Sequence, residues 1–236
     1  MDSIYKALAE ELKKSNYTVV MTGAGMSTES GIADFRSRDG IWKKYDPMKV
    51  ATVNALENDY DNLHGFYSMR DEARIQRKPH KGHHILAEWE DKELISSIIT
   101  QNVDNFHHQA GSRNVFEIHG SIDKFRCKDC GEPSDRESFL GKEPCPECGG
   151  KIRPGIVLFG EPLPEKELYG ALEEVKKAEL VIIIGTSLTV YPAASIHSNT
   201  DGRIIYINDE YDGHKKFDMV IEGKVGEILL EVDKFL

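Results

Sequence analysis

Short apolar runs recur along the chain, and longer segments that mix apolar and charged residues at helical spacing separate them. Each short run is typical of a strand buried on both faces of a sheet, and each longer segment is typical of a helix that buries one face. Strands that alternate with helices in this way predict an α/β fold, in which a parallel sheet has helices on both faces. The expected strands are 18–22, 94–100, 114–118, 180–185, 203–208 and 218–221. Helices are expected at 2–14, within 46–90 and at 164–177.

All four cysteines fall in one polar segment, which is rich in Lys, Asp, Glu, Gly and Pro and interrupts the alternation. They form two Cys-x-x-Cys pairs, Cys127 with Cys130 and Cys145 with Cys148. Two such pairs supply four thiolates for a tetrahedral zinc ion, and a shell of four thiolates leaves no position for a reacting water. Because the N-terminal residues lack the features of a secretory signal, a disulfide framework is disfavoured. We therefore expect one structural zinc ion, with a redox role for the pairs as the alternative.

Composition narrows the classes of partner. The 236 residues suffice for one large domain, or for one domain with a smaller insert. The formal net charge of −10 argues against bulk binding of nucleic acid. No apolar run approaches the ~20 residues that cross a bilayer. With the reduced cysteines and the missing signal, these features predict a cytoplasmic protein that has no direct nucleic-acid or membrane partner.

The glycine-rich segment after the first expected strand carries the most specific signal in the chain. Gly23 and Gly25 would let backbone N–H groups approach a phosphate, and the helix expected next would point its positive end at the same place. Asp34, Phe35 and Arg36 follow, and such residues are costly to bury for packing alone. The segment therefore predicts a nucleotide-binding site.

Further polar motifs follow the C-terminal ends of other expected strands. They are Gln101 to Asp104, His119, Gly185 to Ser187, and Asn208. Ligands of an open parallel sheet bind at that edge, so we expect these residues to converge in space. A plain dehydrogenase is disfavoured, because Thr28 replaces the third glycine of the dinucleotide pattern and the acidic residue expected after the second strand appears only at Asp209.

Taken together and in order, the motifs resemble those of the sirtuin family. The resemblance runs from about residue 18 to the C-terminus, and the joint occurrence of the motifs is much more specific than any one of them. The matching motifs are Gly23-Ala24-Gly25-Met26-Ser27 through Asp34-Phe35-Arg36-Ser37, Thr100-Gln101-Asn102-Val103-Asp104, His119-Gly120, the four cysteines, Phe159-Gly160-Glu161, Gly185-Thr186-Ser187-Leu188 and Ile207-Asn208.

The resemblance implies an NAD-dependent protein-lysine deacylase. Such an enzyme cleaves its co-substrate NAD to nicotinamide and transfers the acyl group of an acylated-lysine protein or peptide to ADP-ribose. It also implies a Rossmann-like parallel sheet with helices on both faces, and a smaller zinc-binding and helical module. The implied division assigns 1–36, 81–120 and 156–236 to the Rossmann-like domain, 37–80 to the helical part of the small module and 121–155 to its zinc-binding part.

The same resemblance assigns roles to individual residues. His119 is the implied general base, since a histidine side chain titrates near neutral pH. The implied substrate groove pairs the acyl-lysine peptide as a strand against the 157–161 segment, with contacts from Val157, Phe159, Gly160 and Glu161. The implied NAD contacts are Gly23, Ala24, Gly25, Thr28, Phe35, Arg36, Gln101, Asn102, Val103, Asp104, Gly185, Thr186, Ser187, Asn208 and Val225.

Tyr67 and Arg70 leave two interpretations open. Three residues apart on an expected helix, they share one face, and the plain interpretation is a packed tyrosine beside a solvated arginine. In the sirtuin subgroup that acts on succinyl- or malonyl-lysine, a Tyr-x-x-Arg motif binds the acyl carboxylate, and a guanidinium with a phenol suits that anion. One departure from the family pattern bears on the nearby loop, since Asn105 stands where glycine is usual.

Two other functions remain as alternatives at this level. A mono-ADP-ribosyltransferase would use the same NAD site with a protein acceptor, and a non-catalytic NAD-sensing adaptor would bind NAD without turnover. The sequence leaves open the preferred acyl chain, the protein targets, the oligomeric state and the balance of deacylation against ADP-ribosyl transfer. The paired histidines His83-His84 and His107-His108 are expected to be ordinary helix residues.

Overall fold

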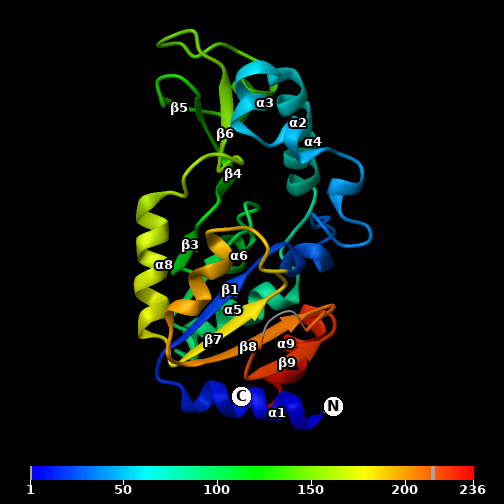
Figure 1. The fold of residues 1–236 in the computed structure, drawn as a ribbon, viewed down its shortest axis with the longest axis vertical. Helices are drawn as coiled ribbons and strands as arrows, with labels where there is room; N and C mark the ends of the chain where they lie inside the picture. The colour runs from blue at the N-terminus through cyan, green and yellow to red at the C-terminus, as the bar shows by residue number, and fades with distance from the viewer. Residues whose placement is uncertain (1, 214–215) are drawn as a thin grey trace.

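The computed structural model describes residues 2–213 and 216–236. Its larger part, the lower part of Figure 1, is built on a six-stranded parallel sheet of order β3-β2-β1-β7-β8-β9. The order reverses between β1 and β7, as in a Rossmann-type doubly wound sheet. The strands are β1 (Thr18–Thr22), β2 (Ser97–Thr100), β3 (Val115–Glu117), β7 (Leu180–Ile184), β8 (Arg203–Asn208) and β9 (Met219–Glu222).

Alternate side chains of the central strands fill two separate apolar layers. Val20 and Ile182 pack with the helices on one face, and Val19 and Ile183 pack with those on the other. β-Branched residues suit strands that are buried on both faces, which explains why β1 and β7 match their expected positions. The first face is covered by α1 (Asp2–Lys14), α5 (Lys81–Asp91) and α9 (Val225–Asp233), and the second by α8 (Glu165–Lys177) and the 3-10 helix η3 (Ala193–Asn199).

A smaller module lies above the sheet in Figure 1. Its three-stranded sheet has the order β5-β4-β6 and is antiparallel. One shared core joins this sheet to the neighbouring helices, and it includes Ile156 and Leu158. The elements are η2 (Ile41–Lys43), α2 (Pro47–Val50), α3 (Val53–Asn58), α4 (Tyr60–Ile75), β4 (Gly120–Cys127), β5 (Pro133–Ser134), α7 (Arg136–Leu140) and β6 (Ile152–Ile156).

Three expected elements differ from the structure. The strand expected at 94–100 begins only at Ser97, because the N–H groups of Leu94 and Ile95 donate to the carbonyl of Trp89 and extend the end of α5. The strand expected at 114–118 is shortened to β3. The helix after the glycine turn is a short 3-10 helix, η1 (Ala24–Ser30), which ends at Gly31 with φ +83°. Within the described residues, no helix is both long and apolar enough to cross a membrane.

Candidate active site

The loops that follow β1 and β7 pack directly against each other where the strand order reverses. Gly23 N–H donates to the carbonyl of Ile184 (3.0 Å), and Gly25 N–H donates to that of Gly185 (2.8 Å). A Cβ atom on Gly185, whose φ is +63°, would lie 2.3 Å from the backbone nitrogen of Met26. The glycines are thus required for close packing of the two loops. The N–H groups of Gly23 and Gly25 therefore already have acceptors within the protein.

A hydrogen-bonded network holds the loop after β2 against η1. The Ser27 hydroxyl donates to Asp104 Oδ2 (2.7 Å), and the side-chain amide of Asn102 donates to Ser27 Oγ (3.1 Å). The backbone N–H of Phe106 donates to Asp104 Oδ1 (3.0 Å). Burial raises the pKa of Asp104, although the bonds from Ser27 and Phe106 oppose that shift. The Asp104 carboxylate is therefore fixed at the edge of the sheet by two direct donors, Ser27 and Phe106, and Asn102 holds Ser27 in turn.

His119 lies two residues beyond the end of β3, directly before β4, and its ring is bonded to the loop after β2. Its Nδ1 lies 3.0 Å from the carbonyl oxygen of Gln101, which can only accept, so Nδ1 carries the proton and Nε2 keeps its lone pair. Among the described residues, no hydrogen-bond partner reaches Nε2. Burial lowers the pKa of His119, and the bond to Gln101 opposes the shift only in part. The ring is therefore neutral at pH 7 and able to accept a proton. Gln101 in turn donates to the Thr186 hydroxyl (3.1 Å), which links the β2 and β7 loops.

Arg70 and Tyr67 lie together on α4. The Arg70 guanidinium stacks over the rings of Phe35 (4.7 Å) and Phe66 (5.9 Å). Within the described part of the chain it has no ion pair. Burial lowers the pKa of Arg70, while the charges of Tyr67 and Asp104 raise it, and burial also raises the pKa of Tyr67. Tyr67 is buried, as the plain interpretation expects, and the half-buried Arg70 cation lies against two aromatic rings.

The 157–161 segment already uses part of its backbone. Phe159 N–H donates to the carbonyl of Ala51 (2.9 Å), and its carbonyl accepts from Val53 (3.1 Å). Val157 N–H donates to the carbonyl of His119 (2.8 Å). The Phe159 side chain is 41% exposed, and Gly160 has a φ of +98°. The segment is therefore fixed on one side, with an exposed aromatic ring on the other.

The side chain of Glu161 faces inward. It forms an ion pair with the buried Arg153 and accepts the N–H of Leu158 (2.8 Å). Burial acts to raise the pKa of Glu161, but the bonds from Arg153 and Leu158 outweigh it and hold that pKa below its usual value. The Glu161 carboxylate therefore fixes the conformation of the 157–161 segment through its contacts with Arg153 and Leu158.

The other residues expected to contact NAD lie along the same edge of the sheet, and their side chains differ in exposure. Asn208 ends β8 and donates to the carbonyl of Glu210 (2.8 Å). Val225 is buried in the core at the start of α9. Thr28 and Arg36 are exposed, and Ala24, Phe35 and Val103 are half-buried. The Ser187 hydroxyl is exposed and bonded to Thr189 (3.0 Å).

The four cysteines come together in the small module. Their Sγ atoms all lie within 4.8 Å of one another, with Cys127 and Cys148 3.5 Å apart and Cys130 and Cys145 3.7 Å apart. Zinc–thiolate bonds of ~2.3 Å in a tetrahedron place sulfur atoms about 3.8 Å apart, so this cluster fits zinc and is far too open for disulfides. A Cβ on Gly150 would lie 2.7 Å from Cys127 Sγ, so only glycine leaves room for the cluster there.

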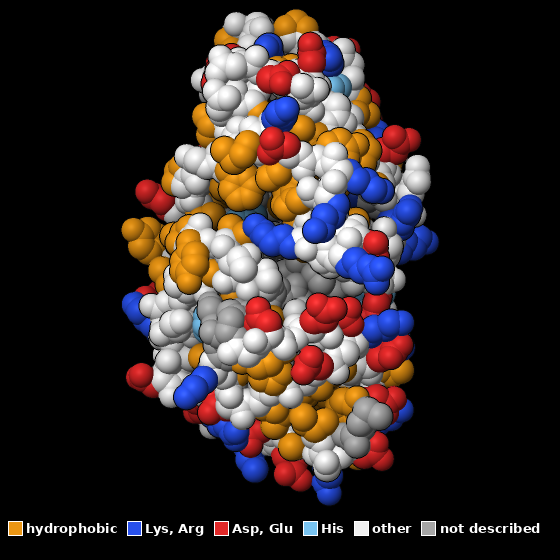
Figure 2. All heavy atoms as spheres, turned by 45° about the vertical axis from the view of Figure 1, so that its right-hand side comes forward, with side chains coloured by type: hydrophobic (Ala, Val, Ile, Leu, Met, Phe, Trp, Pro, Cys, Tyr) orange, Lys and Arg blue, Asp and Glu red, His pale blue; other side chains and the backbone are white. Residues whose placement is uncertain are grey.

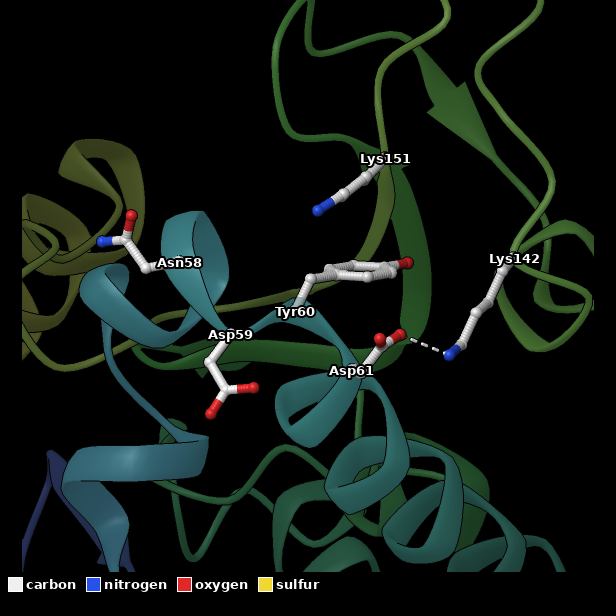
Figure 3. A pocket seen from close by; sticks show the side chains of 6 residues that line it. All are labelled: Asn58, Asp59, Tyr60, Asp61, Lys142 and Lys151. Atoms are coloured by element: carbon white, nitrogen blue, oxygen red, sulfur yellow. Dashed lines mark hydrogen bonds and ion pairs between the residues drawn. The ribbon is translucent and has the colours of Figure 1, made fainter.

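The hollow drawn in Figure 3 lies away from this edge, at the start of α4 in the small module. It measures about 380 Å³ and is lined by Asn58, Asp59, Tyr60, Asp61, Lys142 and Lys151. Lys142 pairs with Asp61 (2.5 Å), and Lys151 lies over the Tyr60 ring (4.8 Å). Both cations are thus already partnered within the hollow, and it carries no catalytic group of the kind found at the sheet edge.

A reversed parallel sheet with polar groups gathered at its switch point, joined to a four-cysteine module, defines a nucleotide-binding protein of the Rossmann type with a structural metal site. The family model described as the Sir2 family matches residues 23–192, and the chain belongs to this family. It is 42% identical over 227 residues to the NAD-dependent protein deacetylase of Oceanobacillus iheyensis, covering 94% of this chain and 96% of that one. It is also 42% identical to the NAD-dependent protein deacylase 2 of Archaeoglobus fulgidus, over 98% and 95% of the two chains.

Solved structures agree with this assignment. A crystal structure of a Sir2 homologue in complex with NAD has a TM-score of 0.90 and 38% identity, and the match covers 98% of this chain and 93% of that one. A Sir2 protein bound to a deacetylated p53 peptide and 3′-O-acetyl ADP ribose has a TM-score of 0.88 and 34% identity, and the match covers 97% of each chain.

Sequence reasoning missed a group of three histidines, His80, His83 and His107, whose rings contact one another behind this edge. His80 lies 4.5 Å from His83, and His83 lies 5.0 Å from His107, measured between ring centroids. His83 and His107 are helix residues as expected, but both are buried. Because α5 and α6 (Phe106–Ala110) meet only in the folded chain, the sequence carries no local signal for this contact.

Proposed function

We propose that this protein is an NAD-dependent protein-lysine deacylase, which splits NAD and transfers the acyl group of a lysine side chain to ADP-ribose. The observation that carries the proposal is the neutral His119, whose Nε2 lone pair is unused at the same sheet edge as the fixed Asp104 carboxylate. The Sir2 family membership and the relatives named as deacetylases and deacylases support it. Lys and Arg side chains gather at the level where the small module meets the sheet, which suits an anionic co-substrate (Figure 2).

The proposed roles follow the position of each residue along the edge. Asp104 and Asn102 bind nicotinamide and its ribose, with help from Gln101 and Val103. The backbone of Gly23 to Gly25 lies near the diphosphate of NAD in this proposal. The other NAD contacts are Ala24, Thr28, Phe35 and Arg36 from the β1 side, and Gly185, Thr186, Ser187, Asn208 and Val225 from the β7 to α9 side.

The reaction begins when the bond between nicotinamide and ribose breaks. The acyl oxygen of the lysine amide bonds to the anomeric carbon as nicotinamide leaves with the bonding electron pair. His119 Nε2 then takes a proton from a ribose hydroxyl, and that oxygen bonds to the former amide carbon. Water completes the release of the free lysine, and the acyl group stays on ADP-ribose as an ester. Exclusion of bulk water protects the activated sugar from hydrolysis until then.

We propose that the acyl-lysine peptide lies along the exposed side of the 157–161 segment, beside Val157, Phe159 and Gly160. Glu161 supports this segment through Arg153. Arg70 and Tyr67 are the residues proposed to set the acyl preference. A guanidinium that lies over aromatic rings and has no ion pair among the described residues can receive the carboxylate of a succinyl or malonyl group. We also propose the domain division given above, and a reducing, cytoplasmic location that keeps the four thiolates available to zinc.

The proposal is tested by stoichiometry. Purified protein is mixed with NAD and an acetyl-lysine peptide, and nicotinamide, free lysine peptide and O-acetyl-ADP-ribose are each quantified. We expect one of each per turnover, with nicotinamide release depending on the acylated peptide. Stable label on an unacylated protein from labelled NAD would instead support ADP-ribosyl transfer. Intact NAD with every acyl peptide would support the non-catalytic alternative.

A further inference from the structure

His80, which directly precedes α5, uses both nitrogens of its ring. Its Nδ1 accepts the backbone N–H of Gly82 (3.0 Å) and so caps the helix, and its Nε2 lies 2.6 Å from the carbonyl oxygen of Met26. An N–H group can only donate and a carbonyl can only accept, so both bonds require the neutral ring with its proton on Nε2. Protonation of Nδ1 would set two donors against each other at Gly82.

The carbonyl that His80 holds belongs to η1, the segment that shapes the cofactor side of the sheet edge. Met26 is fully buried. Its neighbour on one side, Gly25, is bonded to the β7 loop, and its neighbour on the other, Ser27, donates to Asp104. A change in the position of the Met26 carbonyl therefore moves both contacts.

A third element closes around the same ring. A Cβ on Gly226, in the first turn of α9, would lie 2.9 Å from His80 Nδ1 and 3.0 Å from Glu29 Oε1. Glu29 Oε2 accepts the N–H of Gly226 (2.5 Å). His80 thus lies where η1, α5 and α9 meet.

We propose that neutral His80 is a positioning residue that holds the 24–30 segment in its NAD-binding conformation, and that protonation of this ring releases the segment and weakens NAD binding as the medium is acidified. The inference rests on the proposed function in that NAD is taken as the ligand of this edge.

The groups around His80 are consistent with this titration. They are His83, His84 and Lys81 on α5, Glu29 on η1 and, behind His83, His107 on α6. Burial lowers the pKa of His80, and the bond to Met26 and the charge of Glu29 oppose that shift. Burial lowers the pKa of His83 further and that of His107 to about 3, so these two rings stay neutral in the native protein during mild acidification.

The direction of the effect follows from this lowered pKa. An unfolded or released His80 binds a proton near pH 6.5, whereas the clamped ring does so only at a lower pH. The stabilisation that His80 gives to the 24–30 segment is therefore complete above about pH 6.5. It is lost as the pH falls below that value towards the lower pKa of His80 in the folded protein.

The test measures the dissociation constant of NAD by calorimetry from pH 8 to pH 5.5. The variants are His80→Asn and, as a matched control, His84→Asn, which removes an exposed histidine from the same helix. An asparagine at position 80 can still cap Gly82 without titrating, but it is too short to reach Met26. The loss of one hydrogen bond worth ~1 kcal/mol corresponds to about fivefold weaker binding.

We expect affinity in the unmodified protein to fall severalfold from pH 7.5 to pH 5.5, and His84→Asn to follow it. His80→Asn should bind NAD about fivefold more weakly at pH 7.5 and lose most of the pH dependence. Wild-type affinity with a wild-type pH profile in His80→Asn would overturn the inference. If that variant does not fold, a flat profile in the unmodified protein overturns it just as well. Failure to bind NAD at any pH would instead count against the proposed function.

Discussion

The sheet edge at the β1–β7 switch point and the four-cysteine module reach a defined geometry by different means. At the edge, the loops are packed glycine against glycine, and the N–H groups of Gly23, Gly25 and Gly185 have acceptors within the protein. In the module, strands as short as β5 surround four sulfur atoms, and two of the four cysteines are exposed. The edge is therefore preformed for its ligand, whereas the module depends on a cation that holds four thiolates together.

The largest effect that separates the two regions is expected from removal of the metal. Chelation or Cys130→Ser should unfold the β4–β6 sheet and abolish deacylation, because a four-thiolate shell cannot close with three thiolates. Hydrogen exchange should rise across 121–155 and stay low in β1 and β7. Zinc content measured on the same sample provides the control. Full activity of the metal-free protein, or equal exchange in both regions, would show that the regions do not differ in this way.

The glycine packing of the edge is tested by Gly185→Ala. The added methyl would meet the backbone of Gly25 and Met26 at 2.3–3.0 Å, so one loop must move. We expect NAD affinity to fall at least tenfold while zinc is retained. Gly65→Ala is the matched control, since nothing lies within 4 Å of its Cβ position on α4. If both variants bind NAD equally well, loop packing does not shape the site.

A change confined to the acyl side of the site is expected from Arg70→Met. Methionine keeps an apolar contact with Phe35 and Phe66 but removes the charge. If this protein removes succinyl or malonyl groups, kcat/KM for these peptides should fall tenfold or more, with less change for acetyl-lysine. The acetyl peptide is the internal control. Equal loss for both substrates would assign Arg70 to packing alone.

The smallest effect is expected on stability at Asn105. This residue has a strained backbone and directly follows Asp104, whose carboxylate is held by hydrogen bonds. Asn105 has a φ of +64° and donates to Asp123 Oδ2 (2.6 Å). Both Asn105→Ala and Asn105→Gly lose that bond, but only alanine is destabilised by the left-handed backbone conformation, because glycine has no Cβ. The alanine variant should therefore be about 1 kcal/mol less stable to denaturant than the glycine variant. Equal stability would show that the loop relaxes without strain.

Regular patterns made the fold predictable. The β-branched runs of β1 and β7 are long enough to identify buried strands, and two Cys-x-x-Cys pairs specify a zinc cluster without knowledge of the fold. Contacts between distant segments were not predictable in the same way. The sequence does not show that Gly25 N–H is already bonded to Gly185, that Arg153 turns Glu161 inward, or that His80 reaches Met26, because each depends on how separate elements pack.

The central claim is that the His119 ring acts as the base at a preformed NAD site. The most direct measurement compares kcat and the NAD dissociation constant of His119→Ala with those of the unmodified protein. We expect kcat for the acyl-lysine peptide to fall by ~10²–10⁴-fold, while NAD binding changes less than threefold and zinc stays bound. Near-normal turnover in this variant would contradict the account.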